Sequence, residues 1–233
     1  KDLLMSMPEN SMLNYLFAKS LLMKVINFRS NDRKRDIIDL EDALNKSILL
    51  NPKNPLPYAL LGLIKEGHTL ANFDTDLGKQ RSNATKYVEK AIELGPENME
   101  ALYYSGKFYR IIGNFSKAIK LFEKAIEIAP FGPEEIRINL VSTHLANFDF
   151  DKASQIATSL LNQGDKRSVF IGSMFLIYIK AKTGEIKDAK NDFKIILDKY
   201  NYTKEAALYQ IRRYSPGTWT WISSEFKSTM DNL

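Results

Sequence analysis

The stretch "ALYYSGKFYRIIGNFSKAIKLFEKAIEIAP", residues 101–130, decides the fold. Its apolar residues recur at helical spacing in two runs, which Gly113 and Asn114 separate. Both of these residues tolerate the left-handed backbone angles that end a helix. Ser116 can cap the start of the second run, and Pro130 stops it. The stretch therefore predicts two consecutive helices joined by a tight turn.

Small and large side chains are matched along the predicted contact between these helices. Gly106 and Ala118 are small enough to let two antiparallel helices approach closely. Tyr109 and Phe122 can fill the wider parts of the same contact. We expect this alternation of small and large residues to hold the pair together.

The same residues return at a fixed interval along the chain. Pro96 and Pro130 are 34 residues apart, and so are Ala84 and Ala118. A common interval of this size indicates a repeat architecture, in which each unit is one small group of secondary-structure elements.

The central copy resembles the tetratricopeptide repeat family, whose pattern is W-x2-L-G-x2-Y, then A-x3-F, then P. The matching positions are Gly106, Tyr109, Ala118, Phe122, Ala125 and Pro130, with Leu102 and Ser105 replacing the first aromatic residue and the Leu. The resemblance implies an all-α fold, a right-handed superhelix or α-solenoid of about five helical pairs followed by C-terminal capping helices. No periodic strand pattern competes with this interpretation.

We expect one solenoid domain over residues 1–233, as a fragment of a longer protein, because neither an initiating Met nor a signal peptide is present. Its parts are a degenerate leading pair (1–52, with helices over 8–28 and 36–50), a repeat with an inserted turn in "NFDTDLGKQRS" (53–96), a regular repeat (97–130), two further repeats (131–165 and 166–202) and capping helices (203–233).

Three short segments are predicted to be the turns inside helical pairs: "LANFD" at 70–74 and 145–149, and "GNFS" at 113–116. In each, Asn ends a helix and Phe73, Phe115 or Phe148 is expected to fold back onto the pair. In the capping region, 204–214 and 219–230 should be helices. Trp219 and Trp221 are interpreted as closing the core of the cap, and a docking role toward another subunit or domain stays open.

The composition excludes several classes of function. The 33 basic and 28 acidic residues give a net charge of +5 and are mixed along the chain, so no direct contact with nucleic acid is expected. The absence of Cys excludes disulfides, a thiol nucleophile and Cys-based metal sites, and it fits a cytoplasmic location. The longest apolar stretch, residues 169–179, is too short to span a membrane and should be a buried helix.

Reactive groups are sparse. The only two histidines, His68 and His144, lack a second His or any Cys nearby in the sequence and are interpreted as structural or surface residues. Glu134 and Glu135 stand where helices commonly begin. Glycine-rich phosphate loops and H-E-x-x-H motifs are absent. We therefore predict no enzyme activity within this chain, no catalytic residues, no metal and no cofactor.

In the resembling family, the first helix of each pair lines a concave groove. Carrying the family's groove positions over to this chain predicts a site for a peptide or partner protein at Tyr103, Lys107, Arg110, Asn139, Ser142, Met174 and Tyr178. Lys107, Arg110 and Asn139 can bind a carboxylate through charge-assisted hydrogen bonds. The alternatives are a hydrated surface for the polar positions and a core role for Met174 and Tyr178.

The sequence is also compatible with a second function. The order of the segments resembles the C-terminal repeat region of bacterial winged-helix regulators of the invasion-gene or ToxR-like type, or of class III adenylate cyclases. That resemblance implies a regulatory or sensory domain of a transcriptional regulator or nucleotide cyclase, whose output domain precedes Lys1. Self-association is also left open.

Overall fold

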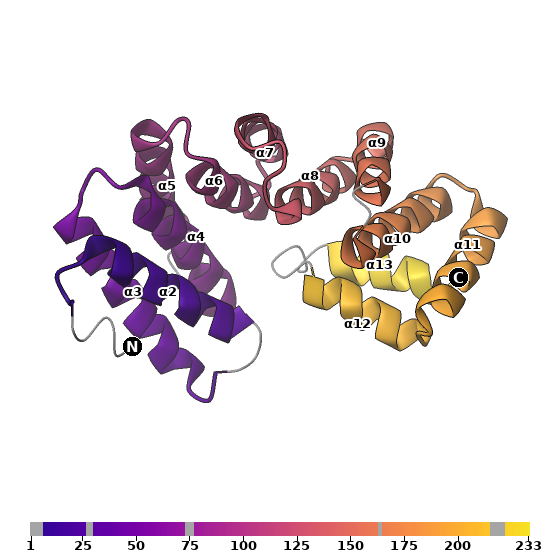
Figure 1. The fold of residues 1–233 in the computed structure, drawn as a ribbon, viewed down its shortest axis with the longest axis horizontal. Coiled ribbons are helices and arrows are strands. Elements are labelled where there is room, and N and C mark those ends of the chain that lie inside the picture. Colours follow the sequence, from indigo (N-terminus) through magenta and orange to yellow (C-terminus); the bar gives the residue numbers. More distant parts are fainter. Residues whose placement is uncertain (1–6, 27–29, 73–76, 163–164, 215–221) are drawn as a thin grey trace. The chain divides into compact units, whose positions relative to one another are not determined.

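The computed structural model describes residues 7–26, 30–72, 77–162, 165–214 and 222–233 (Figure 1). Over these ranges the chain contains twelve α-helices and no strand, which confirms the all-α prediction. The helices are α2 (Ser11–Ile26), α3 (Arg33–Leu50), α4 (Pro55–Asn72), α5 (Leu77–Leu94), α6 (Met99–Ile111), α7 (Phe115–Ile128), α8 (Glu134–Ala146), α9 (Phe150–Leu161), α10 (Lys166–Lys182), α11 (Ile186–Tyr200), α12 (Lys204–Tyr214) and α13 (Ile222–Asp231).

The chain divides into two compact units, residues 1–129 with α2 to α7 and residues 130–233 with α8 to α13. Within each unit, consecutive helices pack as pairs: α2 with α3, α4 with α5, α6 with α7, α8 with α9 and α10 with α11. The first helices of neighbouring pairs also touch, α4 with α6 in the first unit and α8 with α10 in the second. The single domain over residues 1–233 stays a prediction.

Close contacts at glycine hold the pairs of the first unit together. A Cβ atom at Gly106 would lie 2.7 Å from the Phe122 ring, and one at Gly62 would lie 2.5 Å from Cγ2 of Val88 and 2.9 Å from the carbonyl oxygen of Ala84. Phe122 is fully buried. The predicted matching of small and large residues is therefore present in the pair α6 with α7, and Gly62 makes a similarly close contact with Ala84 and Val88 in the pair α4 with α5.

The turn between α6 and α7 follows the prediction except at its cap. Gly113 has a φ of 81°, in the left-handed region. Asn114 is the N-cap of α7, because its side chain accepts a hydrogen bond from the backbone N–H of Lys117 at 3.2 Å. Asn114 thus takes the capping role that the sequence suggested for Ser116, since α7 begins one residue before that serine.

The aromatic residues of the turns behave differently from one another. Phe148 follows α8 with a φ of 59° and remains 64% exposed, so the prediction that it folds back onto its pair is wrong. Phe115, by contrast, is half-buried at the start of α7. Phe73 lies outside the described residues.

The insertion in residues 72–82 lengthens helices instead of forming a long turn. α4 and α5 each have 18 residues, compared with 13 in α6 and 14 in α7. The predicted turn is wrong over residues 77–82, which belong to α5. Lys, Gln and Arg in this segment are good helix formers, and no Pro interrupts it, so elongation from the existing helix is favourable.

The remaining helix predictions can be compared directly. α2 and α3 lie within or next to the predicted ranges 8–28 and 36–50, with α3 beginning three residues early at Arg33 behind its N-cap Asp32. α12 covers 204–214 as predicted, and α13 begins at Ile222. Trp219 and Trp221 lie outside the described residues. In α10, Ile171 and Ile177 are buried, and among the described helices none is long and apolar enough to cross a membrane.

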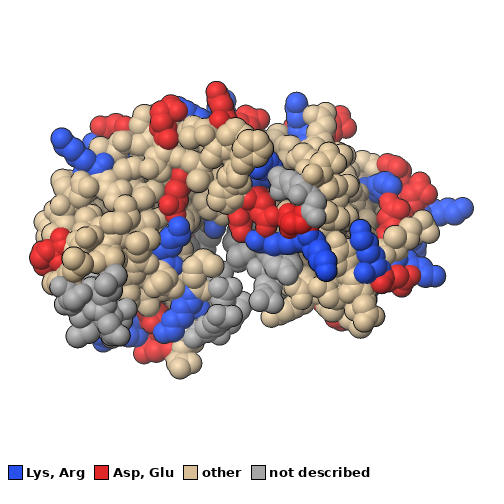
Figure 2. Space-filling model, viewed as in Figure 1, with Lys and Arg blue, Asp and Glu red and all other residues tan. Residues whose placement is uncertain are grey.

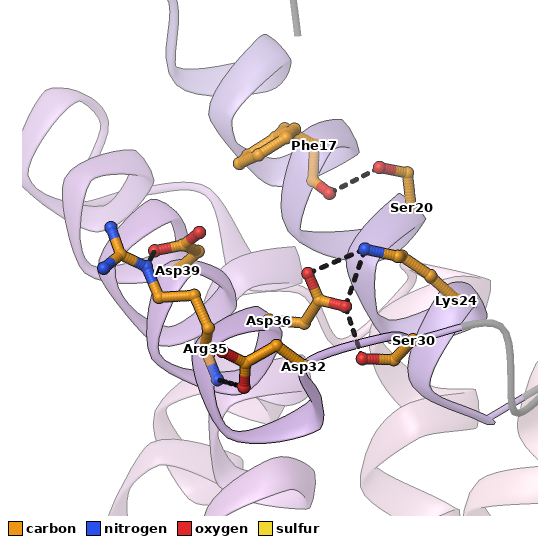
Figure 3. Close-up of polar contacts among 8 residues, drawn as sticks. All are labelled: Phe17, Ser20, Lys24, Ser30, Asp32, Arg35, Asp36 and Asp39. Carbon is orange, nitrogen blue, oxygen red and sulfur yellow. Dashed lines mark hydrogen bonds and ion pairs between the residues drawn. The ribbon is translucent and has the colours of Figure 1, made fainter.

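A polar cluster joins α2 to the start of α3 (Figure 3). Lys24 donates to Asp36 Oδ1 at 3.0 Å and lies 2.8 Å from Oδ2, while the Ser30 hydroxyl donates to Oδ2 at 2.6 Å. The hydrogen bonds from Lys24 and Ser30 lower the pKa of Asp36 below its usual value. Beside the cluster, Arg35 pairs with Asp39 at 2.9 Å along the exposed face of α3.

The Asp36 cluster predicts an acid dependence of stability. Because the pKa of Asp36 is lower in the folded state than in the unfolded chain, its contribution is fully present above the unfolded pKa, near pH 4, and is lost as the pH falls through the folded pKa. Asp36→Asn should remove this part of the pH dependence. Urea unfolding at pH 7 and at pH 3 measures it, and identical pH dependence in the wild type and the variant would contradict the prediction.

The two glycine contacts predict an order of destabilisation. Gly62→Ala should cost more than Gly106→Ala, because one nearest atom at Gly62 is a backbone oxygen, whereas all three at Gly106 belong to the side chain of Phe122. Overpacking costs about 1–3 kcal/mol, against a gain in helix propensity of about 1 kcal/mol. Thermal unfolding followed by circular dichroism ranks the two variants, each serving as the control for the other. The reverse order would refute this account.

Candidate partner-binding faces

Each unit has an inner face, which we define as the side formed by the adjoining first helices: α4 and α6 in the first unit, α8 and α10 in the second. Their partners α5, α7, α9 and α11 are the second helices of the pairs. The sequence-predicted site residues are divided between these faces, with Tyr103, Lys107 and Arg110 on α6, Asn139 and Ser142 on α8, and Met174 and Tyr178 on α10.

On α6 the predicted residues follow one another at i, i+4 and i+7, so they share one face of the helix. Tyr103 is half-buried, and its ring centroid lies 5.4 Å from the Lys107 ammonium, within the range of a cation–π contact. Lys107 and Arg110 are each only 8% exposed. The stripe thus combines one accessible ring with two enclosed cations.

Burial dominates the electrostatics of Arg110. It lowers the pKa of the guanidinium to about 10, and the nearby Tyr103 acts in the opposite direction. Arg110 therefore remains charged at neutral pH while much of its hydration has been removed. An anionic group placed next to this residue would raise the pKa of the guanidinium again, because it favours the charged form.

The leading helix α2 reaches the start of the same face. The Tyr15 hydroxyl donates to Glu100 Oε1 at 2.9 Å, and Lys19 of α2 forms an ion pair with the same oxygen. Burial raises the pKa of both Tyr15 and Tyr104, and the charge of Glu100 adds to it. This cluster was not predicted from the sequence.

A second buried charge belongs to the longer pair of the first unit. Glu66 of α4 is completely buried and accepts two hydrogen bonds from Arg81 of α5, at 3.0 Å and 2.7 Å. Glu66 precedes Arg110 by the same 44 residues that separate Gly62 from Gly106, so the two occupy equivalent helix positions. The equivalent position thus carries opposite charges in successive pairs, and Arg81 pairs with Glu66.

The polar residues of α8 bond mainly to their own helix. Asn139 donates to the Glu135 carbonyl at 2.7 Å, and Ser142 donates to the Ile138 carbonyl at 2.8 Å. Both side chains are almost fully buried, at 4% and 1% exposure. Such bonds to the carbonyl four residues earlier satisfy a buried polar group without a second helix.

The α10 residues of the predicted site are also enclosed. Met174 has no exposed surface and Tyr178 is 4% exposed. This burial favours the core role that the sequence left open for these two residues. A ligand that contacts them has to displace other parts of the second unit.

An ion-pair cluster joins the starts of α8 and α10. Arg167 lies 2.6 Å from Glu134 and 2.9 Å from Glu135, and Ser168 donates a hydrogen bond to Glu134. The two glutamates therefore do more than begin a helix, because they connect neighbouring first helices.

His144 lies in the last turn of α8 and has a structural role. It is buried, and its Nδ1 lies 3.0 Å from Asp149, which caps α9. The side chain of His68 lies outside the described part of the chain. Within that part, no group of three or more His, Cys, Asp or Glu side chains is arranged to hold a metal ion.

Acidic and basic side chains are mixed over the visible face of each unit (Figure 2), in agreement with their mixing in the sequence.

With this geometry established, comparison with known proteins identifies the central pair. Residues 99–131, which include α6 and α7, match the family model described as Tetratricopeptide repeat. This segment is similar to a tetratricopeptide repeat. The match confirms the resemblance that residues 101–130 indicated.

Two relatives extend the comparison. The human interferon-induced protein with tetratricopeptide repeats 2 is 35% identical over 89 residues, which make up 38% of this chain and 18% of the human protein. The crystal structure of yeast Tom70 matches with a TM-score of 0.55 at 19% identity, over 98% of this chain and 45% of the Tom70 chain. The chain thus spans less than half the length of either protein, and it shares the tetratricopeptide-type helical fold.

The Tyr15 contact predicts a specific loss of stability. Tyr15→Phe should destabilise the chain by about 1 kcal/mol, because Glu100 keeps Lys19 but loses the buried hydroxyl donor. Tyr209→Phe is the matched control, since Tyr209 is 62% exposed, and it should be neutral. The urea midpoints of both variants measure the difference. Equal midpoints would show that the Tyr15 hydroxyl bond contributes nothing.

Proposed function

We propose that this chain is a protein–protein interaction scaffold that binds a peptide or partner protein on the inner faces formed by its first helices. The tetratricopeptide-type fold supports the proposal, because it is typically a non-catalytic scaffold. Stacked helical pairs offer an extended surface to a partner without requiring any reactive group.

The stripe of Tyr103, Lys107 and Arg110 on α6 carries the proposal. A half-buried ring beside two enclosed cations suits a ligand with both apolar and acidic groups. A carboxylate from the ligand would stabilise the charged form of Arg110, which burial disfavours. The aromatic ring of Tyr103 supplies contact area at a low cost in conformational entropy.

The finer assignments remain predictions. They are the binding of a carboxylate by Lys107 and Arg110 on the first unit, and partner contacts by Asn139, Ser142, Met174 and Tyr178 on the second. The burial of Asn139, Ser142, Met174 and Tyr178 means that a ligand reaches them only with a rearrangement of the second unit. A cytoplasmic location and the absence of direct nucleic acid contact are predictions of the same kind, and self-association stays open.

Selection of random peptides displayed on phage against the full chain tests this function. We expect the selected peptides to be enriched in acidic and apolar residues. Lys107→Glu should weaken their binding about tenfold or more, since a hydrogen bond to a charged group contributes about 1.5–3 kcal/mol. Lys120→Glu is the matched control on the exposed side of α7 and should leave binding unchanged.

Two results would refute the proposal. One is a set of selected peptides without acidic residues. The other is equal weakening by Lys107→Glu and Lys120→Glu, which would indicate an effect of net charge alone. Circular dichroism of both variants establishes that any difference in binding does not arise from unfolding.

The regulatory alternative is supported by the order of the sequence segments. In that case the chain is the C-terminal sensory part of a bacterial transcriptional regulator or nucleotide cyclase. Reading the gene upstream of Lys1 tests it, and a winged-helix or cyclase domain is the expected result. An unrelated domain in that position would remove this alternative.

A further inference from the structure

The last helix of the chain lies on the inner face of the second unit. α13 packs against α8 and α10, the two first helices that define this face, and also touches α12 (Figure 1). The face that a partner would approach in this unit is therefore already in contact with the chain's own C-terminal helix.

The described residues of α13 have one buried and one exposed side. Met230 is fully buried, and Thr229 and Leu233 are half-buried. The neighbouring residues Lys227, Ser228, Asp231 and Asn232 are exposed. This amphipathic division is the pattern by which a helical ligand docks into an apolar groove.

The C-terminal end of α13 borders an open cavity. This cavity of about 280 Å³ lies between that end and the adjoining ends of α10 and α11, and it opens to solvent. Ala181, Ile186, Thr229 and Leu233 are among the residues that line it. Among the described side chains of α13, Met230 is the one that is fully buried, and the cavity lies beside the end of the helix.

Few described polar contacts fix α13 to the rest of the unit. Lys204 of α12 donates to the backbone carbonyl of Asp231 at 2.6 Å. The ion pair between Lys227 and Asp231 lies within α13 itself. Since α13 has 10 residues, and isolated helices of that length are marginal in water, its helical state depends on docking.

We propose that α13 is a displaceable intramolecular ligand of the second unit's inner face. A partner that binds this face competes with α13 by offering an amphipathic helix with an apolar side chain in the place of Met230. The proposal rests on the scaffold function, since it names the partner chemistry for one of the inner faces. Undocking of α13 is then a local opening of the second unit, and the remaining helix pairs stay folded.

Thiol labelling of the full chain tests the displacement, because the sequence has no Cys of its own. Ala181→Cys places a reporter on α10 at the cavity beside α13, where Ala181 is 8% exposed. Ala189→Cys places a second reporter on α11, where Ala189 is fully buried and is not among the residues that line the cavity. The second reporter measures opening of the whole unit.

Met230→Ala should raise the labelling rate at Ala181→Cys about tenfold or more, because it truncates a fully buried side chain of α13. The rate at Ala189→Cys should stay unchanged. Ser228→Ala, on the exposed side of α13, should alter neither rate. A parallel rise at both reporters would overturn the proposal, because α13 would then be an integral part of the core.

Addition of the ligand in trans completes the test. A peptide of residues 222–233, "ISSEFKSTMDNL", should slow labelling of Ala181→Cys in the Met230→Ala chain at millimolar concentration, which is comparable to the effective concentration of a tethered helix. The same peptide with Met230→Ala should give no protection. Absence of protection by the unaltered peptide would overturn the proposal. The phage-display experiment tests the scaffold function separately, because its Lys107→Glu variant changes the first unit only.

Discussion

The contact between a glycine on one helix and a large side chain on its partner is the constraint on which this fold depends. At Gly62 and at Gly106 the helices are so close that even a methyl group would overlap with the facing helix. The approach brings extended surfaces together, so dispersion and burial of apolar area accumulate along the whole pair. Because this contact recurs in successive pairs, one solution to helix packing is used more than once in the chain.

Much of the fold could be predicted from the sequence, since the signals for helical pairs are local. The spacing of Gly106, Ala118 and Phe122 predicted the α6–α7 pair, and Gly113 predicted its turn. The insertion after Asn72 was misinterpreted, because a polar segment without Pro suits a solvated loop and an elongated helix equally well. The prediction for Phe148 was wrong because its apolar character suggested burial, whereas the residue has a left-handed backbone and is 64% exposed.

The candidate site was less accessible to prediction, because it depends on contacts between residues distant in the sequence. The groove positions of the resembling family indicated Tyr103, Lys107 and Arg110, and these residues lie on one face of α6. The resemblance says nothing about contacts with distant helices. It gave no indication that Glu100 is bound by Tyr15 and Lys19 of a helix more than 80 residues away. Nor could it show that α13 would lie against α8 and α10. Burial of the α8 and α10 positions follows from these tertiary contacts, which a repeat pattern does not encode.

The lengthened α4–α5 pair has a consequence for how such a chain tolerates changes in length. Its additional residues extend two antiparallel helices at the end distant from the turns that connect it to its neighbours, so Gly62 keeps its place opposite Ala84 and Val88. Segments can therefore be gained or lost where α4 leads into α5 without changing the register of the Gly62 contact. The length of this hairpin can thus change independently of the packing that joins its two helices.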